Sequence, residues 1–156
     1  MFYLLIIAGF LFGSCKQPDT TWTENDVTFV RDQVDSTLRQ YHADIERGGL
    51  LAEIKYLDST EQFSWFAPGY SGPIGYDSVV TIVRVMAPLF PKIDHTWDSL
   101  VIAPVSYREA TYLGLVTSLM TDTTGYTDTV RFREEGRVIK YGEHWKLSTG
   151  KTEIIK

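Results

Sequence analysis

Residues 23–49, TENDVTFVRDQVDSTLRQYHADIERGG, hold the most regular pattern in the sequence. Thr23 with Asp26 three residues later is typical of a capping box, and Glu24 and Asp26 suit the positive end of a helix dipole. Gly48 and Gly49 are expected to end the helix. Apolar residues recur at steps of three or four and therefore share one helical face: Val27, Val30, Val34, Leu38, Tyr41 and Ile45. The segment predicts a long amphipathic helix.

The chain then passes through short elements before its pattern becomes strand-like. A short helix is expected at residues 50–57, a strand at 62–66 and a loop rich in glycine and proline at 67–75. Residues 77–90 are open to two interpretations. Their valine and isoleucine content favours a strand, whereas their spacing favours a helix with Asp77 or Ser78 near its cap.

Four strands are predicted beyond Pro91, at residues 92–103, 107–122, 126–141 and 144–155. Their short connections indicate antiparallel neighbours. Within the third strand, Glu135-Gly136 indicates a bulge or a break.

The composition excludes several classes of function but does not identify one. The chain has 156 residues, 44% of them hydrophobic, and a formal net charge of −5, so one folded domain is expected. The acidic balance argues against nucleic acid as a partner and against broad attraction to anionic lipid. The lone Cys15 excludes an intramolecular disulfide. The histidines form no zinc motif, so we expect neither a metal site nor a cofactor.

The first fifteen residues predict export. Residues 2–12 are almost wholly apolar, too short to span a bilayer but as long as a signal-peptide core. Gly13 and Ser14 then precede Cys15, and residues 11–15 resemble the bacterial lipobox, whose cysteine receives a diacylglycerol. The alternative is a buried N-terminal element with an inert thiol. We expect a signal peptide at 1–14, a lipidated Cys15 with a tether to residue 22, and a domain at 23–156, held in the bacterial cell envelope on a periplasmic or outer-membrane face.

The order of elements resembles a known family. The tail Gly142-Glu-His-Trp-Lys-Leu is similar to the closing strand of SnoaL-like proteins, and Phe63-Ser-Trp-Phe-Ala-Pro-Gly followed by Gly75-Tyr-Asp-Ser is similar to that family's passage from strand through loop to helix. These proteins belong to the nuclear-transport-factor-2-like, ketosteroid-isomerase-like superfamily. The resemblance implies an α+β fold: a cone-shaped, curved antiparallel sheet wrapped around the long N-terminal helix, with two further helices. It favours the helix at residues 77–90.

Strand alternation selects candidate catalytic residues. Asp128 shares a strand face with Val130 and Phe132, so it would be the one inward carboxylate and a general base; the alternative is a solvated residue near the strand end. His95 would point inward beside Trp97, and Tyr41 lies on the apolar stripe of the long helix. Either of them would stabilise an oxyanion, or else both are ordinary core residues.

By the same reasoning Phe63 and Trp65 share a strand face and would line the cavity or the core. We take both, with Trp97, as candidate ligand-binding residues, while Glu134-Glu135 suggests a solvated turn. Two functions follow. One is a lipid-anchored module that binds a small apolar ligand or a partner without catalysis; the other is an isomerase or cyclase that uses a cavity carboxylate. A homodimer through the outer sheet face is compatible with either.

Overall fold

The computed structural model describes residues 22–155, so the predicted signal peptide and Cys15 lie outside the described residues. The first helix, α1 (Glu24–Gly48), begins at the predicted capping box: Thr23 Oγ1 accepts a hydrogen bond from the Asp26 amide, and the Thr23 amide donates to Asp26 Oδ2 at 2.9 Å. Its apolar stripe is buried, with Val30, Val34 and Ile45 fully enclosed. The most regular prediction from the sequence is therefore confirmed.

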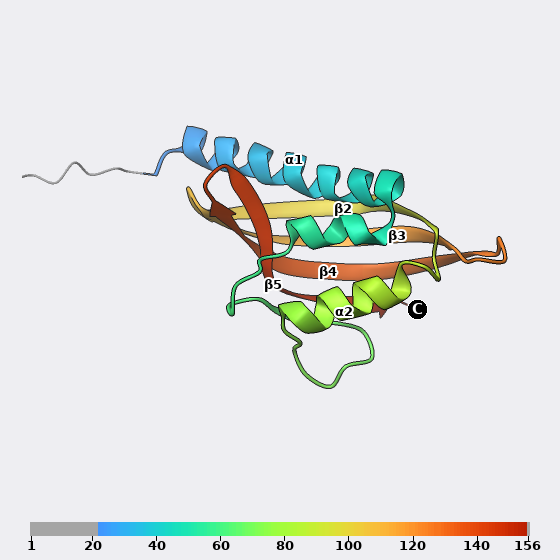
Figure 1. The fold of residues 1–156 in the computed structure, drawn as a ribbon. Coiled ribbons are helices and arrows are strands. Elements are labelled where there is room, and N and C mark those ends of the chain that lie inside the picture. The colour runs from blue at the N-terminus through green and yellow to red at the C-terminus, as the bar shows by residue number, and fades with distance from the viewer. Residues whose placement is uncertain (1–21, 156) are drawn as a thin grey trace, which may run out of the picture.

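Two further helices precede the long strands. A 3-10 helix, η1 (Leu50–Tyr56), follows α1 directly, and α2 (Tyr76–Met86) resolves the ambiguous segment as helix. Between them lies the short strand β1 (Ser64–Phe66). Figure 1 shows the three helices on one side of a curved sheet, with α1 running along the strands behind it. No helix among residues 22–155 is long and apolar enough to cross a membrane.

The sheet has the order β1-β5-β4-β3-β2. The four long strands are β2 (Lys92–Ser106), β3 (Glu109–Thr121), β4 (Thr127–Tyr141) and β5 (His144–Ile155), joined by tight turns into antiparallel neighbours. Strand β1 pairs parallel to β5, so the sheet is mixed at that edge. The α+β fold expected from the sequence is present.

Two details of the strands differ from expectation. Strand β2 continues through Pro104 to Ser106, because β2 lies at the sheet edge, where a residue without an N–H is tolerated. The irregularity expected at Glu135-Gly136 instead lies one step further, between Arg137 and Val138 in the pairing with β5.

Three glycines make room for three aromatic rings on the inner face of the sheet. A Cβ on Gly114 would lie 2.3 Å from the Trp97 ring, one on Gly136 would lie 2.9 Å from the Tyr112 ring, and one on Gly150 would lie 2.6 Å from the Trp65 ring. Each ring therefore lies against bare backbone that any other residue would obstruct. These close approaches fix the interior in which the site is built.

Candidate functional site

A small cavity of about 50 Å³ lies inside the cone, between the helices and the sheet. We call it the carboxyl cavity, after Glu53 of η1 and Glu134 of β4, which both line it. Its other walls come from α1, α2 and the strands; they are Tyr41, Leu57, Phe63, Trp65, Val79, Leu147 and Thr152. Elements far apart in the sequence thus meet at one point.

Glu134 is the most enclosed acid of the cavity. Its ladder neighbours are Gly114 on β3 and Thr152 on β5, which places it in the middle of the sheet, and it is 5% exposed. The Tyr112 hydroxyl donates a hydrogen bond to Glu134 Oε1 at 2.5 Å. Burial disfavours the carboxylate and raises the pKa of Glu134 to about 7, although the bond from Tyr112 acts in the opposite direction.

Glu53 is half-buried and turns its carboxyl into the same cavity. Burial raises its pKa to about 7, and the charge of Glu134 contributes in the same direction, while a hydrogen bond from Tyr41 lowers it. Burial and the two carboxyls also raise the pKa of the Tyr41 and Tyr112 hydroxyls well above the usual tyrosine value. The cavity therefore combines the Tyr41 phenol with two acids whose pKa values burial raises, and the Tyr112 hydroxyl bonds Glu134 from outside the lining.

Aromatic rings form one wall of the cavity. The Phe63 and Trp65 rings lie stacked with centroids 6.2 Å apart, and Trp65 Nε1 donates to Thr152 Oγ1 at 3.0 Å. Both residues line the carboxyl cavity, and the ligand-binding role expected for them from the sequence stays a prediction. The third candidate ligand-binding residue, Trp97, lies elsewhere in the interior.

Trp97 belongs to what we call the histidine layer, formed by His42, His95, Trp97 and Ser118 between α1 and strands β2 and β3. The His42 ring stacks on Trp97 with centroids 4.4 Å apart, and the His95 ring lies 5.1 Å from His42. Burial lowers the pKa of His42 to about 3 and that of His95 to about 4. His42 Nδ1, His95 Nδ1 and Ser118 Oγ are buried without a hydrogen-bond partner in the described part of the chain.

The three predicted catalytic residues do not form one site. Asp128 pairs with Met120, and Met120 with Ile93, so it is on the inner face as expected, but it lies at the open end of β4 and is exposed. Its carboxylate accepts a hydrogen bond from the Thr129 amide. Strand parity thus predicted the face of Asp128 correctly, but the residue is solvated near the strand end, as the alternative stated, and does not lie in the covered interior. Tyr41 lines the carboxyl cavity, whereas His95 lies in the histidine layer.

Sequence reasoning overlooked the acids that do point inward. Glu134 was interpreted as part of a solvated turn, yet strand β4 is continuous there and Glu134 is buried. The signal was present, because Glu134 shares strand parity with Phe132 and Val130. Glu53 carried no such signal, since its direction depends on how η1 docks after Gly49. Tyr112 was not singled out either, although it occupies an inner position of β3.

An open groove lies on the other side of Leu57 from the carboxyl cavity. Its volume is about 660 Å³; we call it the outer groove, and its walls include Leu51, Ile54, Leu57, Asp58, Tyr76 and Tyr141. Asp58 is 2% exposed, and its carboxylate accepts hydrogen bonds from the Tyr141 and Ser148 hydroxyls at 3.1 Å each. Although burial raises the pKa of Asp58, its hydrogen bonds outweigh that effect and lower it.

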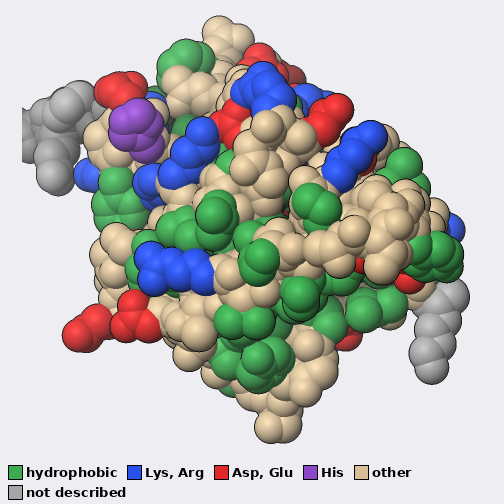
Figure 2. Space-filling model, turned by 45° about the vertical axis from the view of Figure 1, so that its right-hand side comes forward, with side chains coloured by type: hydrophobic (Ala, Val, Ile, Leu, Met, Phe, Trp, Pro, Cys, Tyr) green, Lys and Arg blue, Asp and Glu red, His purple; other side chains and the backbone are tan. Residues whose placement is uncertain are grey.

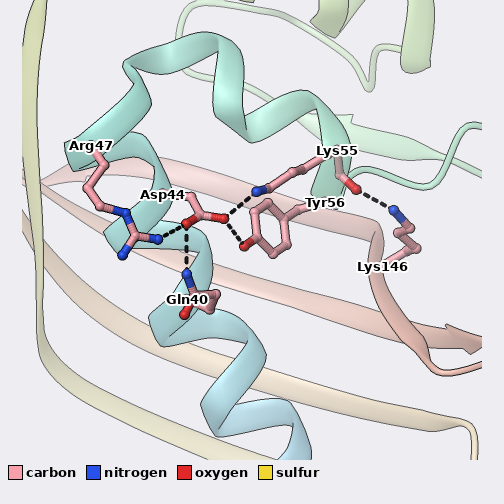
Figure 3. A network of polar contacts seen from close by, with 6 residues as sticks. All are labelled: Gln40, Asp44, Arg47, Lys55, Tyr56 and Lys146. Atoms are coloured by element: carbon pink, nitrogen blue, oxygen red, sulfur yellow. Dashed lines mark hydrogen bonds and ion pairs between the residues drawn. The ribbon is translucent and has the colours of Figure 1, made fainter.

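A polar network beside this groove fixes two lysines. Figure 3 shows four side chains converging on the Asp44 carboxylate, among them Gln40 at 2.7 Å and the Tyr56 hydroxyl at 2.6 Å. The Lys55 ammonium also binds Asp44, and the Lys146 ammonium donates to the backbone oxygen of Lys55. The bond from Lys55 is the largest cause of the lowered pKa of Asp44. The network ties the end of α1 to η1.

Metal binding has no support in the part of the chain that the structure covers. No group of three or more His, Cys, Asp or Glu side chains in residues 22–155 is arranged to hold a metal ion. The arrangement of the carboxyl cavity suits hydrogen bonding and proton exchange instead.

The sequence matches no protein-family model and no curated protein. Several solved structures share the fold. A candidate scytalone dehydratase from Novosphingobium aromaticivorans is 16% identical, with a TM-score of 0.72 over 85% of this chain and 89% of that one. A hexachlorocyclohexane dehydrochlorinase from Novosphingobium barchaimii is 14% identical, with a TM-score of 0.67 over 86% of this chain and 92% of that one.

A third structure carries the family name that the sequence resemblance suggested. It is a nuclear-transport-factor-2-like superfamily protein from Salmonella enterica, 15% identical, with a TM-score of 0.68 over 83% of this chain and 93% of that one. At these identities the likeness is one of fold. The chain therefore has the cone fold of the nuclear-transport-factor-2-like, SnoaL-like superfamily.

Proposed function

We propose that this protein is a lipid-anchored module of the bacterial cell envelope that binds a small ligand inside its cone without catalysis. The observation that carries the proposal is the carboxyl cavity: an interior space where two acids and Tyr41 meet an aromatic wall formed by Phe63 and Trp65, with Tyr112 bonded to Glu134. A ligand pocket typically combines such apolar walls with a few convergent polar groups. The separation of Asp128, His95 and Tyr41 supports binding over chemistry by that set.

The size of the cavity limits what it can hold. Ligand pockets for drug-sized molecules measure roughly 300–1,000 Å³. The carboxyl cavity measures about 50 Å³. It therefore accommodates a ligand, or the head of a longer ligand, of about four non-hydrogen atoms, since one water needs roughly 10–15 Å³ on this scale.

Native mass spectrometry tests the binding proposal. The full chain is incubated with an extract of its host cells, and a retained small molecule is expected that is lost in Trp65→Ala. Asp128→Asn is the matched control because Asp128 is exposed at the end of β4. A protein that retains nothing, or one whose ligand survives Trp65→Ala, would contradict the proposal.

The lipid anchor has its own test. Cells grown with an alkyne-bearing fatty acid are expected to label the wild-type chain but not Cys15→Ser, and the variant is expected to leave the membrane fraction. Equal labelling of both chains would overturn the anchor and leave the cavity proposal unaffected.

A second candidate function is an isomerase or lyase that moves a proton within the carboxyl cavity. The pKa values of about 7 for Glu53 and Glu134 favour it, because a general acid–base pair works best when its pKa lies near the ambient pH. Two proteins with this fold are described as a dehydratase and a dehydrochlorinase. Once a ligand is known, Glu134→Gln distinguishes the two functions: a binding module turns nothing over in either form, whereas an enzyme loses turnover in the variant.

The outer sheet face is where we propose a homodimer would form. Val101 on β2 pairs directly with Leu113 on β3, and both side chains are exposed, at 65% and 40%. Sedimentation of the wild type and of Leu113→Glu tests this contact. A monomeric wild type would contradict it, and so would a dimer that the variant leaves intact.

A further inference from the structure

We propose that the ligand of the carboxyl cavity carries a positive charge, in the form of a small organic ammonium group. This inference rests on the proposed function and names the chemical class of the ligand. It follows from the charges that line the cavity, from the aromatic wall and from the groove beyond Leu57.

The charges of the cavity are one-sided. The residues that line it supply two carboxyls, Glu53 and Glu134, and no lysine, arginine or histidine. None of the ion pairs found within residues 22–155 includes either acid. Buried charges are normally paired, because an unpaired charge loses the solvation of water without a counter-ion. A cation placed between the two acids would supply the missing partner, whereas an anion would be repelled.

The aromatic wall adds a second attraction for a cation. The Phe63 and Trp65 rings stack beside the acids, and the Tyr41 ring lies across the cavity from them on α1. The face of an aromatic ring attracts a cation, most strongly for tryptophan, and combinations of rings are a common way to bind organic ammonium groups. A hydrated inorganic cation would gain less from such a wall, which favours an organic one.

The outer groove continues the same chemistry toward solvent. Leu57 lines both the cavity and the groove, and beyond it the groove presents Asp58 together with the rings of Tyr76 and Tyr141. Figure 2 shows hydrophobic side chains gathered on the face that it draws. Leu51 of the groove wall is 51% exposed. A ligand with an ammonium head in the cavity and a short apolar tail in the groove would match both surfaces, but it would have to displace the Leu57 side chain, which is 5% exposed and lines both spaces.

The groove also contains two lysines, of which Lys55 has a carboxylate partner and Lys146 has a backbone oxygen as its partner. The Lys55 ammonium is bound by Asp44, and the Lys146 ammonium donates to the backbone oxygen of Lys55, so both groups are held in the network of Figure 3. Their aliphatic stems remain as groove wall. Asp58 is buried and hydrogen-bonded, and Lys146 keeps its charge, so the preference for a cation comes from the carboxyl cavity and not from the groove.

Binding of a cation must release protons. The titratable groups that line the cavity are Tyr41 of α1, Glu53 of η1 and Glu134 of β4, and Tyr112 of β3 bonds Glu134, whereas the lining residues of α2, β1 and β5 are not titratable. An ammonium group stabilises the ionised carboxyls, so protonated acid transfers its proton to the buffer as the ligand enters. An uncharged ligand would leave these protons in place.

Calorimetry on the full chain, purified in mild detergent with a detergent blank, tests the inference. The probes are n-butylammonium at pH 7 and its uncharged counterpart 1-butanol, each titrated in two buffers of different ionisation enthalpy. We expect the amine to bind at least tenfold more tightly than the alcohol and to release about half a proton or more per site. Glu134→Gln is expected to weaken the amine at least tenfold.

Glu135→Gln is the matched control, because Glu135 is the next residue of β4 and pairs with Arg133 outside the cavity. Its affinity should equal that of the wild type. If 1-butanol binds as well as the amine with no proton release, the charge inference is overturned while ligand binding stands. If neither probe binds and native mass spectrometry finds no ligand, both proposals fail. Equal weakening in both glutamine variants also overturns the inference.

Discussion

The carboxyl cavity and the histidine layer bury polar groups in the same interior, but burial shifts the pKa values of their groups in opposite directions. Burial penalises the charged form in both places, which raises the pKa of Glu53 and Glu134 and lowers that of His42 and His95. Their hydrogen bonding also differs. Glu134 receives a bond from Tyr112, whereas His42 Nδ1 and His95 Nδ1 have no partner within residues 22–155.

The comparison shows why one region suits a ligand and the other does not. The acids line an open space, so a ligand can complete their interactions. The His42 ring is covered by Trp97, which itself lies on Gly114, so the layer is a packed part of the core. Buried polar atoms without partners destabilise a fold by about 1–3 kcal/mol each. The histidine layer is thus a source of instability, whereas the cavity is where we propose that a ligand binds.

The largest effect on stability is expected from a substitution that overpacks the histidine layer. In Gly114→Val the new side chain would occupy the space of the Trp97 ring and approach the Ser99 carbonyl, where even a Cβ comes within 2.8 Å. Overpacking of this kind should lower the free energy of unfolding by roughly 3 kcal/mol. Urea denaturation measures it. Gly72→Val is the control, since a Cβ there meets nothing within 4 Å, and an equal loss in both would contradict the packing argument.

The next largest effect is the stability difference between the wild type and a variant of a cavity acid, and this difference increases with pH. The folded-state pKa of Glu134 lies at about 7, above its unfolded value, so its contribution to stability is complete below pH 4.5 and is lost as pH rises through 7. Glu134→Gln cannot ionise and should gain on the order of 2–3 kcal/mol relative to the wild type between pH 4.5 and pH 8.

Denaturation at several pH values measures this difference, with Glu135→Gln as its control on the same strand. A stability difference between wild type and Glu134→Gln that stays constant with pH would show that Glu134 ionises freely in the folded protein.

For the histidine layer, the dependence of stability on pH should have the opposite sign. The folded-state pKa of His42 is about 3, below its unfolded value of about 6.5, so its contribution is complete above pH 6.5 and is lost as pH falls. Relative to the wild type, His42→Gln should gain about 2 kcal/mol between pH 7 and pH 5. His144→Gln is the control, because His144 is exposed at the start of β5. Matching profiles for the two variants would contradict burial as the cause.

Much of this fold could be predicted because its signals are local. The capping box of α1, the step of its apolar residues and the short turns between strands all depend on neighbours in the sequence. The aromatic rings that lie on Gly114, Gly136 and Gly150 could not be predicted in the same way. Each ring and its glycine are on different strands, so their contact depends on sheet register.

The candidate site shows the same limit in one comparison. Strand parity places Asp128 and Glu134 on the same face of β4, and only their distance from the strand end distinguishes them. Asp128 lies one residue after the first residue of β4, where no helix covers the face, whereas Glu134 lies beneath the helices at the middle of the strand. Periodicity gives the face of a strand, but coverage by other elements decides burial.

The smallest expected effect tests that distinction directly. Asp128 is exposed, and its one hydrogen bond within residues 22–155 comes from the neighbouring Thr129 amide, so Asp128→Asn should change the free energy of unfolding by less than about 0.5 kcal/mol at every pH. It should also leave the affinity for n-butylammonium unchanged. The measurement is the same denaturation and calorimetry used for Glu134→Gln, which makes the two carboxyls a matched pair on one strand face. A pH-dependent loss in Asp128→Asn would mean that the open end of β4 closes over Asp128, and the acid selected by strand parity alone would then belong to the interior.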